Sequence, residues 1–559
     1  MPTRARKFRG GLEQTFRHPG QLSPGPKMNN PLIVVPLLAL PLLLAWPPFD
    51  WPGMGWVALA PVMLSLKYLP GKARQWFAAG WGFGVVFYAF QFAWLPRAML
   101  ELGGLPFRFF LGFALLGLTF LALFPAVVIG LSRLAQERGL SPYFVFPVLV
   151  GVQEAVLGVF PFNGMPWGSL AATQTHTLAA RLLLPLAGAP ALALALAGLN
   201  ALWAWAAGEM IAGKKIAVSA PLALALGLLI LFQPWPPAPA RQEGRGFTAL
   251  LVPGDLTLAQ MHGEFRGREG LRYYLARSLQ WVGEKGEERT KTDAPNRPPL
   301  PQPQFGAAVG RAPTGSDAGE GNRRRGADLV IWPESAVNGR VEEGKLLSDL
   351  AQVGEVLGVD FILGSEARER GADFNSAYLV VGKPFDFFRY DKRELVPFGE
   401  YVPTGFRWAF GKKVTAGEAD YRAGEAPPVL RWRGVEIGMA ICFESVLPAH
   451  MRRAVRSGAQ AIVALANDQW LTPAAGLQHL RLTALRGLEI GRDVLLVSNG
   501  GWSAHLREGR VVAGGERGGP VRAEPTLSSA KTPWVRWGYY PFTGLALLLL
   551  VGGWLCRRE

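Results

Sequence analysis

Residues 327–334 read Ala-Asp-Leu-Val-Ile-Trp-Pro-Glu, and residues 435–444 read Val-Glu-Ile-Gly-Met-Ala-Ile-Cys-Phe-Glu. Each stretch is a short apolar run, and each reaches a reactive side chain at its end, Glu334 in the first and Cys442 in the second. A buried strand that stops at a carboxylate or a thiol places that group where loops gather catalytic residues on a rigid scaffold. The two stretches therefore predict an α/β enzyme domain.

Further short runs surround these two between residues 246 and 530. Strands are expected at 248–252, 327–332, 361–364, 377–381, 435–442, 461–466 and 494–498, and helices at 269–283, 344–357, 446–457 and 474–491. This alternation predicts a mainly buried sheet layered by helices. Residues 286–326 are rich in Pro, Gly and Arg and have almost no large aliphatic side chains, so we expect a disordered surface insertion there.

The rest of the chain is largely apolar. Of its 559 residues 50% are hydrophobic, and the mean hydropathy is positive, which is unusual for a soluble enzyme. Stretches near the ~20 residues that a helix needs to cross hydrocarbon occur at 31–47, 53–68, 76–95, 107–132, 142–161, 178–207, 215–233 and 541–556. We expect a polytopic α-helical membrane domain of about eight helices, seven within 31–233 and the last after the polar domain.

Lysine and arginine predict the orientation of these helices. They concentrate in the tail of residues 1–30, which we expect to be disordered, and in one set of alternate connections with Lys67, Lys72, Arg74, Arg133, Arg138, Lys214, Lys215, Arg557 and Arg558. Because cytoplasmic loops carry the excess of positive charge, both termini are expected inside and the polar domain outside, in the periplasm or its equivalent. This topology explains the net charge of +16 better than nucleic-acid binding does.

Several polar and aromatic residues carry weaker signals. The cysteines are Cys442 and Cys556, which form no disulfide framework, and no His/Cys/Asp cluster has metal-ligand spacing, so no metal or cofactor is expected. Glu154 lies inside an apolar stretch, where a hydrogen bond between helices is favoured over a functional role. Trp167 ends a turn that is equally well read as a lipid entrance or as part of an aromatic belt.

A third run, residues 391–403, completes the chemistry with Lys392 and Glu400. A cysteine attacks as a thiolate and needs a proton acceptor, while the oxyanion that forms on the attacked carbonyl needs a positive partner. Glu334 fits the first need and Lys392 the second. Taken singly, each residue is more often inert packing or a solvated charge; their conjunction predicts a catalytic site.

At these residues the chain resembles the carbon–nitrogen hydrolase (nitrilase) superfamily, whose Glu-Lys-Cys triad appears in this order on an αββα sandwich. The runs 332–336, 395–403 and 441–444 are similar to those of the apolipoprotein N-acyltransferase family in particular. That family has eight spanning helices with the nitrilase-like domain before the last, so the resemblance extends over nearly all of the chain beyond Met28. It implies an enzyme of the bacterial inner membrane.

The resemblance also implies residue roles. Glu334 would be the general base, Lys392 the oxyanion stabiliser and Cys442 the nucleophile, with Glu400 and Glu444 as supporting carboxylates. His479 would belong to the wall and scaffold segments of the site, without a catalytic role. The expected substrate contacts are Trp332, Phe443, Trp470 and Trp167. The sequence departs from the family at Pro253 to Leu256 and at Leu471 to Pro473, which bears on lid and acyl-chain contacts but not on the triad.

The implied reaction is the transfer of a fatty acyl group from a phospholipid, through a thioester on Cys442, to the amine of a diacylglyceryl-cysteine on an apolipoprotein. A monomer acting at the bilayer without a cofactor is expected. One alternative is a membrane-anchored amidase of the nitrilase type that uses water as acceptor. Another is a transporter or scaffold with a silent outer domain, which predicts paired charges along the spans, where only Glu154 is found.

Overall fold

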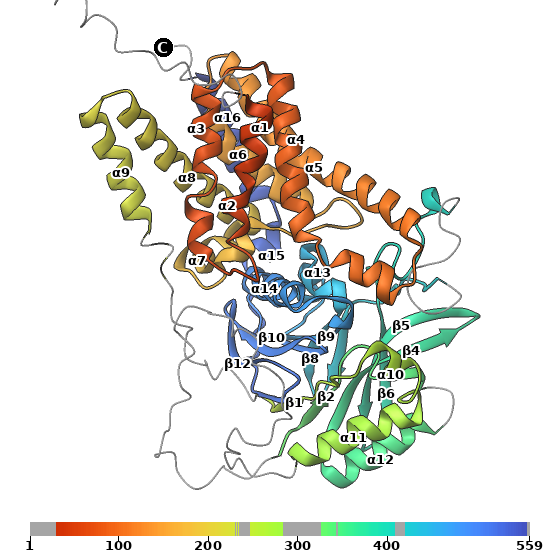
Figure 1. The fold of residues 1–559 in the computed structure, drawn as a ribbon. Helices are drawn as coiled ribbons and strands as arrows, with labels where there is room; N and C mark the ends of the chain where they lie inside the picture. The colour runs from red at the N-terminus through yellow and green to blue at the C-terminus, as the bar shows by residue number, and fades with distance from the viewer. Residues whose placement is uncertain are drawn as a thin grey trace, which may run out of the picture.

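The computed structural model describes residues 30–229, 231, 233, 246–282, 326–341, 345–407 and 420–555. It consists of a helical half and a sandwich of sheets and helices, stacked end to end (Figure 1). The expected basic tail of residues 1–30 and the insertion of residues 286–326 lie almost wholly outside the described residues, as does Cys556.

The helical half is built from apolar helices that run lengthwise, toward and away from the sandwich (Figure 1). They are α1 (Pro31–Leu37), α2 (Ala39–Leu43), α3 (Ala60–Tyr68), α4 (Ala73–Gln91), α5 (Phe107–Glu137), α6 (Pro142–Leu157), α7 (Leu178–Ala187), α8 (Ala189–Ile211), α9 (Lys215–Leu229) and α16 (Tyr540–Leu555). Among the described residues, α5 and α8 are long and apolar enough to cross a membrane, against the eight spans expected. The others are shorter or less apolar, and local breaks shorten some of them, such as the one at Gly188 between α7 and α8, with φ 76°.

Close backbone contacts hold the helical half together. A Cβ on Gly84 of α4 would lie 2.6 Å from the Cα of Ala122 on α5, so only glycine lets these helices approach this closely. The buried Asn200 of α8 accepts hydrogen bonds from the amides of Leu59 (2.8 Å) and Ala60 (3.1 Å) at the start of α3. Its side chain therefore satisfies the otherwise unpaired amides at that helix start.

The sandwich contains two sheets. Within the described residues the first has the order β13-β1-β2-β4-β5-β6, with β3 beside β4, and the second has the order β12-β11-β10-β9-β8-β7. Their bounds are β1 (Ala249–Leu251), β2 (Leu329–Ile331), β3 (Val337–Arg340), β4 (Asp360–Glu369), β5 (Ala372–Val381), β6 (Asp386–Asp391), β7 (Val429–Trp432), β8 (Val435–Ile441), β9 (Ala461–Asn467), β10 (Val494–Asn499), β11 (Trp502–Arg507), β12 (Arg510–Arg517) and β13 (Val521–Ala523).

Apolar side chains from both sheets meet in one core, with Ile331 and Leu379 from the first sheet and Ile441 and Leu465 from the second. The outer face of the first sheet is covered by α10 (Leu258–His262), α11 (Arg268–Val282) and α12 (Leu346–Leu357), and that of the second by α13 (Pro448–Arg456) and α14 (Pro473–Ile490). The expected αββα sandwich is confirmed. The central strands β1, β2 and β4 run parallel, as do β8, β9 and β10, so reactive groups that follow them share one edge.

Helix α14 lies between the two halves and is buried from Ala475 to Ile490. Leu482, Leu485 and Leu488 join the apolar core of the helical half, whereas Leu477 and Leu480 join the core that covers the second sheet. Arg481 forms an ion pair with Asp50 in the turn after α2. Glu489, at the far end of α14, accepts a hydrogen bond of 2.7 Å from the amide of Ala189 at the start of α8. Both apolar and polar contacts thus join α14 to the helical half. The short helix α15 (Pro533–Trp537) lies beside it.

Candidate active site

Three strand ends bring the predicted triad together. Glu334 follows β2, Lys392 follows β6 and Cys442 follows β8. The ammonium group of Lys392 lies 3.8 Å from the Glu334 carboxylate, and the Cys442 thiol donates a hydrogen bond to that carboxylate. Glu334, Lys392 and Cys442 therefore form one cluster, as the resemblance to the carbon–nitrogen hydrolases implies.

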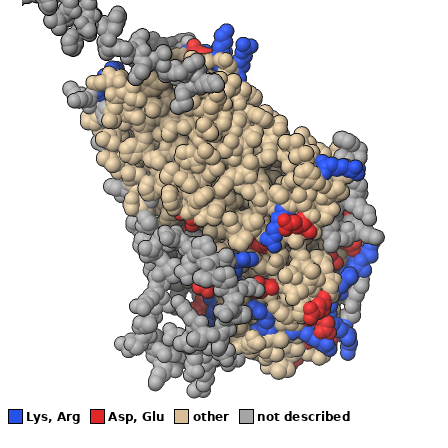
Figure 2. Space-filling view, viewed as in Figure 1, with Lys and Arg blue, Asp and Glu red and all other residues tan. Residues whose placement is uncertain are grey.

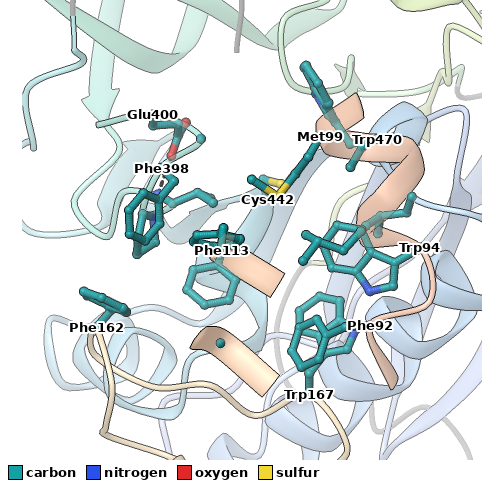
Figure 3. Close-up of a pocket in the computed structure, with 18 of the residues that line it drawn as sticks. Phe92, Trp94, Met99, Phe113, Phe162, Trp167, Phe398, Glu400, Cys442 and Trp470 are labelled. Carbon is teal, nitrogen blue, oxygen red and sulfur yellow. Dashed lines mark hydrogen bonds between the residues drawn. The ribbon is translucent and has the colours of Figure 1, made fainter. Parts of the chain in front are cut away.

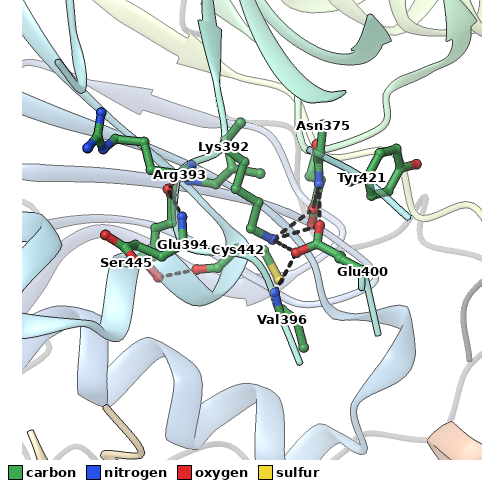
Figure 4. Close-up of polar contacts among 12 residues, drawn as sticks. Asn375, Lys392, Arg393, Glu394, Val396, Glu400, Tyr421, Cys442 and Ser445 are labelled. Carbon is green, nitrogen blue, oxygen red and sulfur yellow. Dashed lines mark hydrogen bonds and ion pairs between the residues drawn. The ribbon is translucent and has the colours of Figure 1, made fainter. Parts of the chain in front are cut away.

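A second carboxylate holds the lysine in place. Lys392 is 1% exposed, and its ammonium nitrogen lies 2.9 Å from Glu400 (Figure 4). The amide group of Asn375 donates to both Glu334 and Glu400, each at 2.8 Å, and the backbone amide of Val396 donates to Glu400 at 2.7 Å. Both oxygens of Glu400 thus have hydrogen-bond partners, and its charge neutralises and orients the buried ammonium group of Lys392. Glu334 lies beside this pair.

Glu444 is buried on the other side of the lysine loop. Its carboxylate accepts hydrogen bonds of 2.8 Å from the Tyr390 hydroxyl, the Arg393 amide and the Ile441 amide. Tyr390 and Arg393 flank Lys392, and Ile441 precedes Cys442. The carboxylate therefore ties the backbone around the cation to the backbone around the nucleophile, which lie in different sheets.

Burial and charge together shift the pKa values of the triad. Burial raises the pKa of Glu334 above its usual range, and the charge of Lys392 opposes that rise. Burial, followed by the negative charge of Glu334, raises the pKa of the Cys442 thiol well above its usual value. Burial alone would lower the pKa of Lys392, but Glu400 and Glu334 raise it. Burial and the neighbouring carboxylate thus favour the neutral thiol of Cys442, and the charge of Lys392 opposes them.

The backbone at the site is constrained. Cys442 has φ 53° and Ser335, which follows the base, also has φ 53°, and non-glycine residues seldom adopt this region. Gly364 in β4 passes so close to the base that a Cβ there would lie 2.6 Å from the Cα of Glu334. Such strain persists only where the surrounding structure holds it, which here fixes the directions of the base and the thiol.

The triad opens into a cavity of about 1660 Å3 that reaches from the sandwich into the helical half. Glu334, Lys392 and Cys442 line its polar end. Its apolar walls come from α5 and from loops of both halves, and include Trp94, Met99, Phe110, Phe113, Leu116, Phe120, Phe162 and Phe398 (Figure 3). The rings of Phe113 and Phe398 meet edge to face at 4.8 Å across the junction. The cavity thus offers a long apolar surface that ends at a nucleophile.

Three of the four expected substrate contacts line this cavity: Trp167, Phe443 and Trp470. Trp332 does not. It is buried in the core on the outer face of the first sheet, between Tyr274 and Phe361, and its indole nitrogen donates to Ser278 at 3.0 Å. Successive side chains point to opposite faces of a strand, so Ile331 enters the core between the sheets and Trp332 the core on the outer face, whereas Glu334 lies beyond the end of β2. We correct this expectation.

Other lining residues were not expected from the sequence. Asn375 carries a polar side chain at a buried position of β5, which is the signal that marks it. Phe113 and Phe398 carry no such signal, because aromatic residues are common in apolar helices and loops. His479, expected in the scaffold, is buried in α14 and reaches the cavity wall. Glu154 of α6 accepts a hydrogen bond from the Ser169 hydroxyl in the turn before the short helix Leu170–Gln174, so its partner lies in a loop and not on a neighbouring long helix. Among the residues with defined positions, no cluster of three or more His, Cys, Asp or Glu side chains could hold a metal ion.

The chain matches two protein families. Residues 38–202 match the N-terminal domain of apolipoprotein N-acyltransferase, and residues 308–515 match the carbon–nitrogen hydrolases. The apolipoprotein N-acyltransferase of Pseudomonas aeruginosa is 28% identical over 90% of this chain and 91% of its own length. That of Geobacter metallireducens is 27% identical over 79% of each chain. A solved carbon–nitrogen hydrolase superfamily protein of Xanthomonas campestris is 16% identical, covering 51% of this chain and 91% of its own, with a TM-score of 0.34.

The two matched segments divide the chain as the structure does, one lying in the helical half and the other in the sandwich that carries the Glu-Lys-Cys cluster. Curated relatives with one and the same name match both halves in a single alignment. The chain is an N-acyltransferase that belongs to the apolipoprotein N-acyltransferase family, within the carbon–nitrogen hydrolase superfamily.

Proposed function

We propose that the enzyme takes a fatty acyl group from a membrane phospholipid onto Cys442 and passes it to the N-terminal amine of a diacylglyceryl-cysteine on an apolipoprotein. One observation carries the proposal. The thiol lies at the polar end of a cavity whose remaining wall is apolar and is shared with α5, a helix long and apolar enough to lie in a bilayer. An acyl chain lying along α5 would present its ester to the thiol.

The first half-reaction forms a thioester. The Cys442 sulfur attacks the ester carbonyl while Glu334 accepts the thiol proton, and the negative charge that develops on the carbonyl oxygen is stabilised by Lys392. The carbon–oxygen bond of the ester then breaks, and the proton held by Glu334 moves to the departing alkoxide. The products are a lysophospholipid and acyl-Cys442. Glu400 keeps the ammonium group in position through this step.

The second half-reaction uses the same groups in reverse order. The acceptor amine attacks the thioester carbonyl, Glu334 takes a proton from the nitrogen, and Lys392 again faces the oxyanion. The carbon–sulfur bond breaks, the proton returns to sulfur, and an amide is released. Because Glu334 acts as base in its ionised form, acyl transfer should rise with pH through the pKa of Glu334, which burial raises above its usual range.

We further propose that the apolar segments of the helical half cross the bacterial inner membrane eight times, with the sandwich in the periplasm and both termini in the cytoplasm. The visible face of the helical half is nearly free of charge, whereas charged side chains gather over the sandwich and at the opposite end (Figure 2). The connections from α3 to α4 and from α5 to α6 lie at that opposite end (Figure 1). Lys72 and Arg138 belong to them and Arg74 to the first turn of α4, which agrees with the excess of positive charge in cytoplasmic loops.

The decisive experiment is intact-mass analysis of the purified enzyme incubated with phosphatidylethanolamine vesicles alone. We expect a mass increase of one acyl group that maps to Cys442, together with lysophospholipid. Addition of a synthetic diacylglyceryl-cysteinyl peptide should remove the adduct and yield acylated peptide. An enzyme that never carries an acyl group, or that releases free fatty acid with or without the peptide, would instead be an amidase or esterase that uses water.

A further inference from the structure

A chain of buried polar side chains lies behind the nucleophile and is not used by the triad. The Nδ1 atom of His479 lies 2.8 Å from Oδ1 of Asp468, and its Nε2 atom lies 2.8 Å from Oγ of Ser445. The Ser445 hydroxyl donates a hydrogen bond of 2.8 Å to the backbone carbonyl of Cys442, beside which it lies in Figure 4. The chain therefore ends on the backbone of the reacting residue.

The hydrogens of this chain can be counted. A serine hydroxyl has one hydrogen, and that of Ser445 goes to the carbonyl of Cys442, so its oxygen accepts from His479 and Nε2 must carry a proton. The contact of 3.1 Å with Thr483 uses the second lone pair of the same oxygen. On the other side, Asp468 accepts from the Ser498 hydroxyl at 2.9 Å and from Nδ1. Both ring nitrogens then donate, which is the pattern of an imidazolium ion.

The charges around the ring agree with this count. Burial alone would lower the pKa of His479, but the Asp468 carboxylate raises it above its usual value. The charged groups that face the ring are the Asp468 carboxylate after β9 and the Glu334 carboxylate after β2, and the backbone of Cys442 after β8 also accepts a hydrogen bond from the ring. The helical half contributes the ring of Trp167, whose centroid lies 6.4 Å from that of His479.

We propose that the protonated His479 and Asp468 form a positioning pair for the nucleophile. The pair fixes the direction of the Ser445 hydroxyl, and the hydroxyl holds the Cys442 backbone at φ 53°, where the thiol reaches Glu334. When Nε2 loses its proton, it becomes an acceptor and attracts the Ser445 hydrogen. The Cys442 carbonyl then loses its partner, and a strained backbone that is no longer held relaxes.

The proposal rests on the acylation of Cys442 and predicts how its rate depends on pH. Single-turnover acylation of the full-length wild type should decline as pH rises through the pKa of His479. Asp468→Asn removes the carboxylate that retains the proton, so the decline should move to lower pH by about one unit or more. Ionisation of Cys442 would change the rate in the opposite direction. Loss of the Lys392 proton would not shift with Asp468→Asn.

Two substitutions of the histidine separate positioning from packing. His479→Gln retains an amide donor near the position of Nε2 but does not titrate, so it should keep most of the wild-type kcat and lose the alkaline decline. His479→Leu fills similar space without a donor and should lower kcat by up to about 10²-fold. KM for phospholipid should change much less than kcat, because both side chains fill similar space where residue 479 reaches the cavity wall.

Alkylation of Cys442 by iodoacetamide, which needs no lipid, is followed in parallel. A wild type that alkylates but takes no acyl group would overturn the proposed function alone, and the shift with Asp468→Asn must then appear in the alkylation profile. Equal kcat for the Gln and Leu variants, or an unchanged decline in His479→Gln, would overturn the positioning role. If the Leu variant does not fold, the pH profiles of the wild type, Asp468→Asn and His479→Gln still test the positioning role.

Discussion

Glu334 and Lys392 share one buried site but act with opposite sign on the Cys442 thiol. The charge of Glu334 raises the pKa of the thiol, whereas the charge of Lys392 lowers it. Glu334→Gln removes the base together with one cause of the high thiol pKa, so acylation should fail near neutral pH and recover in part as rising pH ionises the thiol directly. Single-turnover acylation followed by intact mass across a pH series measures this recovery.

Lys392→Met should behave differently in the same pH series. It removes the oxyanion partner, which typically costs ~10²–10³ in rate, and it also removes the charge that favours the thiolate. No recovery at high pH is expected, and both acylation and aminolysis should slow while phospholipid binding survives. Equal recovery of the two variants, or of neither, would mean that the base and oxyanion roles are not divided between these residues.

Cys442→Ser should abolish acyl transfer without affecting insertion into the membrane. A serine hydroxyl at the same place is far less ionised than a thiol beside the same base. Cys556→Ser is the matched control, and we expect full activity because that residue belongs to the end of the chain remote from the site in the proposed topology. Activity is measured as acylated peptide formed, and near wild-type transfer by Cys442→Ser would remove the thiol from the mechanism.

At the scale of elements, the sequence predicts the buried parts of the sandwich well and its edges poorly. The seven predicted strands correspond to β1, β2, β4, β5, β8, β9 and β10, and the four predicted helices to α11, α12, α13 and α14. Six strands in the described part of the chain were not predicted, and two of these are β3 and the buried β11. The other four, β6, β7, β12 and β13, lie at the outer ends of the sheets, and β6 and β12 have exposed, polar or Gly-containing sequences. Their pairing depends on a neighbouring strand already in place, which local periodicity does not reveal.

The site divides in the same way. Glu334 and Cys442 follow predicted strands, and Lys392 lies in a run that resembles the family, so all three could be named from the sequence, whereas the partners of His479 could not. Asp468 and Ser445 are brought to the histidine by the packing of α14 on the second sheet, and Ser445 lies 34 residues from it in the sequence. Trp332 was wrongly expected to contact the substrate, because the sequence around it predicts a strand but not the face of the sheet on which each side chain lies.

The loop that carries Phe398 forms part of the apolar wall. Phe398→Ala should raise KM for phospholipids with long acyl chains severalfold and leave kcat nearly unchanged, because it removes the contact with Phe113 but touches no triad residue. Phe387→Ala is the control, since Phe387 is exposed on the edge strand β6 and does not line the cavity. Steady-state kinetics with donors of different chain length make the comparison. A fall in kcat alone would contradict a binding role.

The insertion before β2 is expected to be dispensable. Deletion of residues 290–322 should leave a folded, active enzyme, because a segment so rich in proline and polar residues contributes little core, and loop length costs little entropy. Thermal unfolding in detergent and the acylation assay are measured together. A stable but inactive variant would show that the segment takes part in substrate docking.

At the scale of the whole molecule, the topology is testable with single cysteines in a Cys442→Ala, Cys556→Ser background. Val356→Cys lies on α12 of the sandwich, where the valine is 86% exposed, and Pro70→Cys lies in the exposed connection between α3 and α4. A membrane-impermeant maleimide added to spheroplasts should label the first and not the second. Labelling of Pro70→Cys alone would reverse the orientation, and labelling of both only after lysis would place both sites in the cytoplasm and overturn the proposed topology.

The burial of α14 limits how the chain can be divided into fragments or recombined in chimeras. A fragment confined to the sandwich would leave the leucines of α14 that join the core of the helical half, and the ion-pairing group of Arg481, without the surfaces that cover them. The helical half alone would lose the group that holds the first amide of α8. Exchange of either half with that of a distant relative should therefore disrupt the packing of α14 and the folding of the chimera, even where the catalytic residues are retained. Chimeras of this family need to inherit α14 together with the helices of the helical half that it contacts.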